Sequence, residues 1–210
     1  NIYIIMSDEM SIFDLEVDSF KEKKSNKTNL YKPNADQGNG GVYTALIRFL
    51  PNIRNPQKSK ITKHSHWLED NEGNGHYFDC PTSVGDSCMV CNKFFELKDS
   101  DSAVDQERAK NFRRQTSHFH LVQIVDDKQK PDLARSVKIS PFGWTVNEKY
   151  QSVLETDYGE PVIPADLFHG TEFVLTVSKN GGWNNYDPCH FTGDRSSLPI
   201  DGSRLAKGPK

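Results

Sequence analysis

Cys80-Pro81-Thr82-Ser83-Val84-Gly85-Asp86-Ser87-Cys88-Met89-Val90-Cys91 is the stretch from which we predict how this chain is organised. It contains three of the four cysteines, and the last two have the Cys-x-x-Cys spacing that lets two thiolates hold one metal ion from a single turn. With Cys80 and an upstream histidine, they would complete a tetrahedral Zn2+ site. A site closed by four protein ligands leaves no position for a reactive water. We therefore expect one structural zinc that stabilises an otherwise polar region.

The histidine ligand has two candidates. His66 lies closer to Cys80 in the sequence and is favoured, whereas His64 competes because residues two apart point to the same face of a strand. His76 is nearer still, but it falls beside the turn at residues 71–75. Without a metal, the cysteines would form one or two disulfides or remain buried thiols.

The length of 210 residues predicts one domain with a small subdomain and tails. Only 35% of the residues are hydrophobic and the mean hydropathy is -0.71, which predicts a modest core. No apolar stretch is long enough to span a membrane, and the first residues lack the pattern of a signal peptide. Reduced thiols fit the cytoplasm best.

The formal net charge of -3 does not predict nucleic-acid binding, but the distribution of charge is uneven. An acidic start is followed by a lysine-rich run at residues 21–32. A second basic cluster comprises Arg108, Lys110, Arg113 and Arg114. Local patches set the field that a ligand meets, although each patch taken alone is equally compatible with a solvated surface.

Several β-branched and aromatic runs predict a mainly β fold with short helices. The clearest strands are residues 42–50, 117–125 and 173–177, with helices expected at 88–98 and 147–155. Short, well-spaced strands favour a partly open barrel of the OB-fold type with a small zinc-binding subdomain. The expected organisation is an acidic and basic arm at 1–40, a core at 41–200 that includes the zinc subdomain at about 61–112, and a polar basic tail at 201–210.

Basic and aromatic residues are interleaved at residues 48–49, 112–119 and 183–186. Single-stranded nucleic acid requires this mixture, because its phosphates attract Arg and Lys while its unstacked bases pack on aromatic faces. The alternative is structural: Phe49 would belong to the core, Trp183 and Tyr186 would cap the barrel, and the arginines at 113–114 would pair with Asp99 or Asp101.

The sequence predicts no enzyme. It lacks a phosphate-binding G-x-x-x-x-G-K-[ST] loop and a His-Glu-x-x-His helix. A zinc deaminase needs His-x-Glu and then Pro-Cys-x-x-Cys. Leu68 follows two residues after His66, His66 follows two residues after His64, and Ser87 precedes Cys88, so neither element is present.

Four segments together resemble the single-stranded DNA-binding, helix-destabilising proteins of T4-type bacteriophages. These are residues 45–51, the His…Cys80…Cys88-x-x-Cys91 order, Arg113-Arg114-Gln115-Thr116-Ser117, and residues 182–187. The resemblance implies an OB-fold core with a zinc subdomain and a cleft that holds single-stranded DNA without sequence preference. It also implies action in phage DNA replication, recombination and repair in the host cytoplasm, with replication and recombination proteins as further partners.

The same resemblance implies which residues bind. By analogy the cleft would be lined by Arg48, Arg114, Phe119, Trp183 and Tyr186. We also expect Arg113 and Lys138 to hold phosphates and His118 to be a weaker stacking residue. The basic segment Lys23-Lys24-Ser25 would mediate self-association along DNA.

The chain departs from the family pattern at three positions. His118 and Ile139 stand where the family has tyrosines, and Gly85 replaces an aromatic residue. Fewer stacking residues predict weaker or differently distributed stacking. Two other functions fit the residues: a zinc-stabilised protein-interaction module, which would ignore DNA, and an RNA-preferring OB-fold protein, which would favour oligo(U) over oligo(dT).

Overall fold

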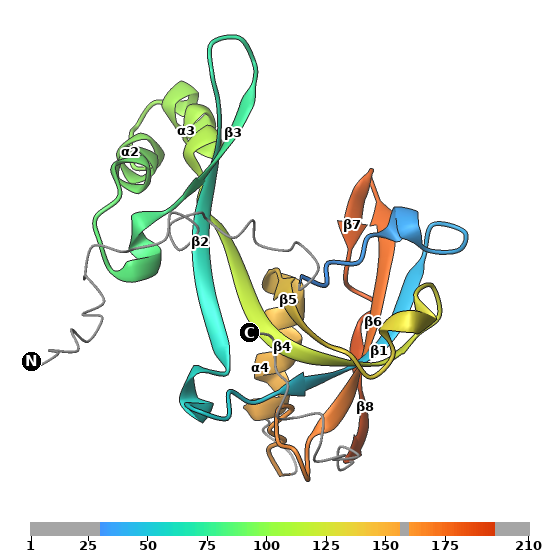
Figure 1. Ribbon diagram of the computed structural model, residues 1–210. Coiled ribbons are helices and arrows are strands. Elements are labelled where there is room, and N and C mark those ends of the chain that lie inside the picture. Colours follow the sequence, from blue (N-terminus) through green and yellow to red (C-terminus); the bar gives the residue numbers. More distant parts are fainter. Residues whose placement is uncertain (1–29, 156–159, 196–210) are drawn as a thin grey trace, which may run out of the picture.

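The computed structural model describes residues 30–155 and 160–195, and Figure 1 shows two lobes joined by long strands. The predicted self-association segment Lys23-Lys24-Ser25, most of the predicted arm and the predicted tail at 201–210 lie outside the described residues. Among the residues that are described, no helix is long and apolar enough to cross a membrane.

The larger lobe is a strongly curved antiparallel sheet. Its central strand β1 (Tyr43–Leu50) pairs on one side with β4 (Gln115–Asp127) and on the other with β6 (Thr171–Asn180). At the flanks, β5 (Val137–Phe142) pairs with β4 and β8 (His190–Arg195) with β6, while β7 (Trp183–Asn185) forms a hairpin with the end of β6. Every second residue of β6 is buried from Thr171 to Val177, as a half-buried strand requires.

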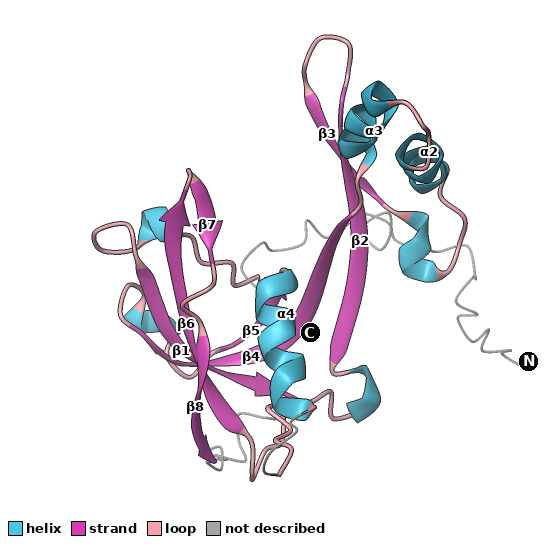
Figure 2. Ribbon diagram, turned by 180° about the vertical axis from the view of Figure 1, so that it is seen from behind, coloured by secondary structure: helices cyan, strands magenta, loops and turns pink. Residues whose placement is uncertain are grey.

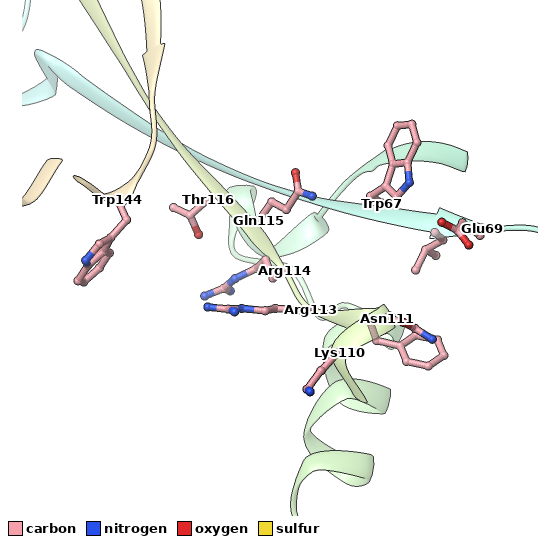
Figure 3. A pocket seen from close by; sticks show the side chains of 11 residues that line it. Trp67, Glu69, Lys110, Asn111, Arg113, Arg114, Gln115, Thr116 and Trp144 are labelled. Carbon is pink, nitrogen blue, oxygen red and sulfur yellow. The ribbon is translucent and has the colours of Figure 1, made fainter. Parts of the chain in front are cut away.

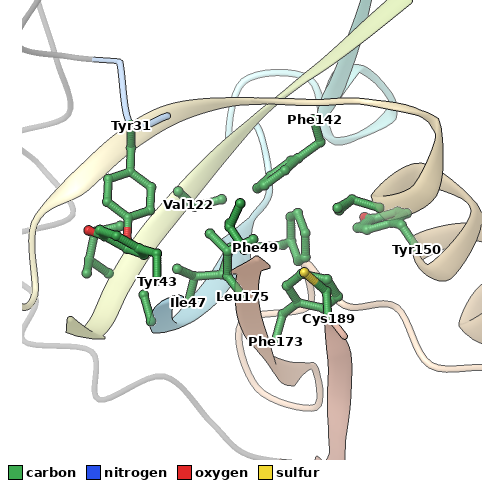
Figure 4. Packing of buried hydrophobic residues seen from close by; sticks show 14 of the residues in the cluster. Tyr31, Tyr43, Ile47, Phe49, Val122, Phe142, Tyr150, Phe173, Leu175 and Cys189 are labelled. Carbon is green, nitrogen blue, oxygen red and sulfur yellow. The ribbon is translucent and has the colours of Figure 1, made fainter. Parts of the chain in front are cut away.

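Aromatic rings fill this lobe, as Figure 4 shows. The ring of Phe49 lies 5.0 Å from that of Tyr150 and 5.6 to 5.7 Å from those of Phe173 and Phe142, in edge-to-face geometry. The helix α4 (Trp144–Leu154) contributes Val146 and Tyr150 and packs against β4 and β5 (Figure 2). The predicted mainly β fold, with short helices and a partly open OB-like barrel, is confirmed.

The smaller lobe is carried by strands that run out of the barrel. The strand β2 (Lys60–Glu69) pairs with the first half of β4 and then with β3 (Gly75–Asp79). Two short helices, α2 (Met89–Lys98) and α3 (Ala103–Ala109), pack on each other beside this hairpin (Figures 1 and 2). Single turns of 3-10 helix connect the elements: Ala35–Gln37, Pro56–Lys58, Pro81–Val84, Lys110–Phe112 and Pro131–Leu133.

The expected start of the core near residue 41 lies too late in the chain. Leu30 forms a parallel bridge with Ile139, and the Tyr31 amide donates to the Ile139 carbonyl over 2.8 Å. Tyr31 and Ala35 are buried within the barrel core. The segment from Leu30 is therefore attached to the core, because Tyr31 and Ala35 are buried in it even though the composition of the segment is polar.

A buried carboxylate anchors this segment. Asp127 Oδ2 accepts hydrogen bonds from the hydroxyls of Tyr31, over 2.8 Å, and Tyr43, over 2.5 Å. Its Oδ1 accepts from the backbone amides of Gln129 and Lys130. Burial raises the pKa of both tyrosines, and the hydrogen bonds to Asp127 raise it further. The hydroxyls therefore stay protonated and donate, which satisfies a carboxylate that no water reaches.

We predict that Tyr31→Phe lowers the free energy of unfolding by about 1.5 to 3 kcal/mol, since a hydrogen bond to a charged group is lost inside the core. Urea denaturation measures the change. Tyr150→Phe is the matched control, because it removes the hydroxyl of another buried tyrosine, one that does not donate to Asp127. Equal losses in the two variants would contradict a specific contribution from Asp127.

A histidine lies among the core aromatic rings. The His120 ring is 5.0 Å from Phe49 and 4.9 Å from Tyr150. Burial lowers the pKa of His120 to about 3, and the charges of Lys60 and His118 contribute in the same direction. The imidazole is therefore neutral at physiological pH.

The pKa of His120 in the folded state lies below the unfolded value of 6.5, so unfolding takes up a proton between these two values. Stability from this residue is complete above pH 6.5 and is lost as the pH falls toward 3. We predict that His120→Phe flattens the pH dependence in this window by up to about 1.4 kcal/mol per pH unit. Urea titrations from pH 7 to pH 4 test this against exposed His169→Phe as control. Parallel curves for wild type and His120→Phe would contradict the assignment.

Candidate metal centre and nucleic-acid groove

Four ligand atoms converge in the smaller lobe. His66 comes from β2, Cys80 follows β3, and Cys88 and Cys91 sit at the start of α2. All four residues are buried, and their ligand atoms lie within 4.8 Å of one another. The Cys80 amide donates to the His64 carbonyl over 2.9 Å, which extends the β2–β3 ladder and brings the cysteine beside His66.

The distances fit a tetrahedral zinc site. The Sγ atoms of Cys80 and Cys91 are 3.6 Å apart, whereas a disulfide would require about 2.05 Å. With Zn–S bonds of about 2.3 Å, the sulfur atoms of a tetrahedron are separated by about 3.8 Å. His66 Nε2 lies 3.4 Å from Cys88 Sγ and 3.5 Å from Cys91 Sγ, as a shared ion requires. The four cysteines are free thiols, so the disulfide alternative is not realised.

His66 rather than His64 joins the cysteines. The Nδ1 atom of His64 instead lies 3.0 Å from the Thr116 hydroxyl on β4. Burial lowers the pKa of His64, and the charge of Arg114 lowers it further. The exposed His76 pairs with Asp70 at the tip of the hairpin. The geometry thus separates two histidines that the sequence left as alternatives.

The thiols influence one another. Burial disfavours ionisation of Cys80, but hydrogen bonds from the Thr82 hydroxyl and amide outweigh it and lower the pKa of Cys80 to about 6. Burial raises the pKa of Cys91, and the neighbouring sulfurs of Cys80 and Cys88 raise it further. Three adjacent thiolates repel one another unless a cation lies between them. The donor set therefore suits Zn2+, which binds thiolate and imidazole.

A groove of about 830 Å3 lies where the metal-bearing lobe meets β4 (Figure 3). One wall is the end of β2, another is the basic segment that follows α3, and Trp144 at the start of α4 stands apart from both. The lining residues are Trp67, Leu68, Glu69, Lys110, Asn111, Phe112, Arg113, Arg114, Gln115, Thr116 and Trp144.

The groove is cationic. Figure 3 shows the side chains of Arg113 and Arg114 extending in the same direction, toward the side on which Trp144 lies. Among the described lining residues, Glu69 is the sole acidic one. Arg114 Nη1 also donates to the Thr82 hydroxyl over 3.2 Å, and that hydroxyl lies 3.1 Å from Cys80 Sγ. One side chain therefore connects the groove with the metal centre.

The structure brings together only part of the predicted DNA-binding set. Arg113 and Arg114 line the groove and are exposed, and no ion pair with Asp99 or Asp101 is seen within the described ranges. His118 is buried, with Nδ1 3.0 Å from the Thr62 hydroxyl, and Phe119 is half-buried. Both lie on β4 just beyond the groove.

The remaining predicted residues lie elsewhere. Trp183 is 81% exposed on the β6–β7 hairpin, so it does not cap the barrel. Tyr186 packs partly buried against the barrel core, as the structural alternative expected. Lys138 is half-buried on β5. None of the three lines the groove.

Arg48 is corrected. It is 1% exposed, and its guanidinium donates to the Asp166 carbonyl over 2.9 Å. The β1 strand is buried on both faces from Ile47 to Leu50, so the alternation that would have turned Arg48 toward solvent does not apply. A carbonyl and nearby acidic groups replace the phosphate that we expected it to hold.

Sequence reasoning missed Trp67 and Trp144, and it did not choose Lys110 from its basic cluster. One signal was available, because the chain has three tryptophans and a tryptophan in a polar context invites a functional explanation. Their common groove arises from the pairing of β2 with β4 and the docking of α4, which no local pattern reveals.

Comparison with known proteins agrees with this geometry. The family described as gp32 DNA binding protein like matches residues 39–199. The proteins named single-stranded DNA-binding protein of Enterobacteria phages T4 and T2 are each 28% identical to the chain over 175 residues, which is 80% of this chain and 57% of theirs. The chain thus spans little more than half the length of these relatives, whose names describe binding rather than catalysis. Because the match covers most of its residues, the chain belongs to the gp32-like family of T4-type DNA-binding proteins.

Proposed function

We propose that this protein binds single-stranded DNA without reading its sequence. The observation that carries the proposal is one groove lined by three cations and two tryptophans: Lys110, Arg113, Arg114, Trp67 and Trp144. Cations attract phosphates, and exposed indole faces stack any base, so this lining suits an unpaired strand. The names of the T4 and T2 relatives support the same ligand.

The binding free energy has two sources. Phosphates on the groove cations release condensed counterions, which makes affinity fall steeply with salt. Bases stacked on aromatic rings contribute roughly 1 to 3 kcal/mol each, with little dependence on base identity. The net charge of -3 does not oppose this, because the local field of the groove decides the encounter. A ligand that binds only unpaired strands destabilises a duplex by mass action.

The proposal includes a place in phage biology. We infer that the protein acts in DNA replication, recombination and repair in the cytoplasm of an infected host, where it contacts replication and recombination proteins. Self-association along DNA would use Lys23, Lys24 and Ser25. The phage origin of both relatives supports this setting.

A bound strand would run beyond the groove. Phe119 on β4, Lys138 on β5 and the exposed Trp183 with neighbouring Tyr186 stay in the proposed contact set. His118 is left out, because it is buried and lies against the Thr62 hydroxyl. Arg48 is left out, because its guanidinium is buried against the Asp166 carbonyl.

The proposed Zn2+ is structural. Held by His66, Cys80, Cys88 and Cys91, it would supply a crosslink between the hairpin and α2. These four ligands leave no open position on the ion, so its contribution to DNA binding is indirect. It fixes Cys80 and hence Thr82, which accepts a hydrogen bond from Arg114 in the groove.

We predict that Arg113→Gln weakens binding of poly(dT) at low salt and reduces the slope of log K against log[salt] by about 0.7, the value for one lost phosphate contact on a single strand. Quenching of tryptophan fluorescence during titration measures both quantities. Arg54→Gln is the matched control, because it removes the same charge from an exposed residue outside the groove.

Two outcomes would contradict the proposal. The first is wild-type protein that shows no binding to poly(dT) at low salt, and the second is an equal change of slope in both arginine variants. Tighter binding to oligo(U) than to oligo(dT) in direct competition would favour the RNA-preferring alternative.

For the metal, we predict one Zn2+ per wild-type chain and none in Cys88→Ser, because a hydroxyl is a poor zinc ligand. The melting temperature should fall by at least about 5 °C, since 1 kcal/mol corresponds to roughly 2 to 4 °C in a chain of this size. Elemental analysis and thermal unfolding followed by circular dichroism measure these changes.

Cys189→Ser is the matched control for the metal. Cys189 is buried in the barrel, where its Sγ bonds to the backbone of Thr176, and it should keep one Zn2+ per chain. Full metal content in Cys88→Ser would overturn the ligand assignment.

A further inference from the structure

The three tryptophans of this chain are all exposed, although tryptophan is usually one of the more buried residues. Trp67 is 50% exposed and Trp144 is 70% exposed. These two line the same groove, while Trp183 lies on a separate hairpin. A lone exposed ring needs no explanation, but two indoles around one basic pair form a pattern that points to a ligand.

Packing within the β2–β3 hairpin holds Trp67 in position. Its indole lies over Gly75, the residue at which β3 begins, and a Cβ atom added to Gly75 would sit 2.0 Å from Cζ2 of the ring. Glycine is therefore required there for the ring to lie against the backbone. Half of the side chain is covered in this way, and the other half stays in solvent.

The place of Trp144 is fixed by α4. Val146 and Tyr150 anchor this helix in the barrel core, and Asn147 Oδ1 accepts a hydrogen bond from Lys60 Nζ on β2 over 3.1 Å. Trp144 is the first residue of the helix, so its backbone is held firmly while its ring projects into solvent. A rigid backbone beneath an exposed ring is what preorganised stacking requires.

We propose that Trp144 stacks a base of the bound strand and that Trp67 stacks a second base, with the intervening phosphates on Arg113 and Arg114. This inference rests on the proposed function and assigns the groove its base-contacting residues. In Figure 3 the two arginines extend toward the side on which Trp144 lies, whereas Trp67 stands on the other side of the view, on β2.

The chemistry around the rings favours a nucleic-acid strand over an apolar peptide. Beside the two indoles and the apolar Leu68 and Phe112, the lining is polar, with three cations, one carboxylate and three neutral side chains: Lys110, Arg113, Arg114, Glu69, Asn111, Gln115 and Thr116. An apolar partner would desolvate these charges without compensation. A strand offers anionic and aromatic groups in alternation and satisfies both kinds of lining.

The test is Trp144→Ala in the full chain, titrated with poly(dT) at several salt concentrations. The dissociation constant should rise about 5- to 150-fold, which corresponds to the loss of one stacked base. The salt slope should stay at the wild-type value, because every phosphate contact remains. Trp144→Phe should restore most of the affinity, since phenylalanine still offers a flat face. Trp67→Ala should behave like Trp144→Ala.

Phe168→Ala is the matched control, because it removes an exposed aromatic side chain outside the groove. Affinity equal to that of wild type in Trp144→Ala would overturn the inference while leaving DNA binding intact. A changed salt slope with full affinity loss in both Trp144→Ala and Trp144→Phe would also overturn it, since misplaced phosphate contacts would then be the cause. Absence of poly(dT) binding by the wild type would instead remove the proposed function itself.

Discussion

The antiparallel pairing of β2 with β4 fixes where the candidate metal centre and the groove lie. Its register runs from Lys60 opposite His120 to Ser65 opposite Gln115. The next residue of β2 is the candidate metal ligand His66, and the residue preceding Gln115 is Arg114 in the groove. Because side chains alternate along a strand, a slip of one residue would turn both to the opposite face. One ladder thus sets the metal centre and the groove together.

The two lobes are stabilised by different means. The barrel has a continuous aromatic core around Phe49, whereas the apolar cluster at the metal centre comprises the three cysteines with Val90 packed against them. So little apolar surface cannot offset the conformational entropy of the loop between β3 and α2. A tetrahedral crosslink through these cysteines and His66 can, because metal binding adds directly to folding free energy. The hydrogen bond from Arg114 to Thr82 would then extend the effect of this crosslink to the groove.

Much of the architecture was predictable where local pattern and tertiary structure agree. The three strongest β patterns became β1, β4 and β6, and the Cys-x-x-Cys pair with the nearby Cys80 predicted three of the four clustered ligands. The predictions that failed concern residues whose positions depend on contacts between distant segments. Arginine is usually a surface residue, yet Arg48 is buried beside Asp166, which lies far along the chain. Tyr31 lies in a polar stretch but belongs to the core, where its hydroxyl donates a hydrogen bond to Asp127.

In the proposed function the groove would bind DNA through both charge and ring stacking, and the two contributions respond differently to salt. Counterion release weakens with added salt, whereas stacking on Trp67 and Trp144 depends little on ionic strength. Each cation sits on a short segment held at both ends, with α3 before it and the β2–β4 ladder after it. Each indole is likewise fixed, one over Gly75 and the other on α4. An unpaired strand would therefore meet a surface ordered in advance. Little of its binding energy would be spent on ordering the protein, and the stacked bases would still hold the strand when salt has weakened the phosphate contacts.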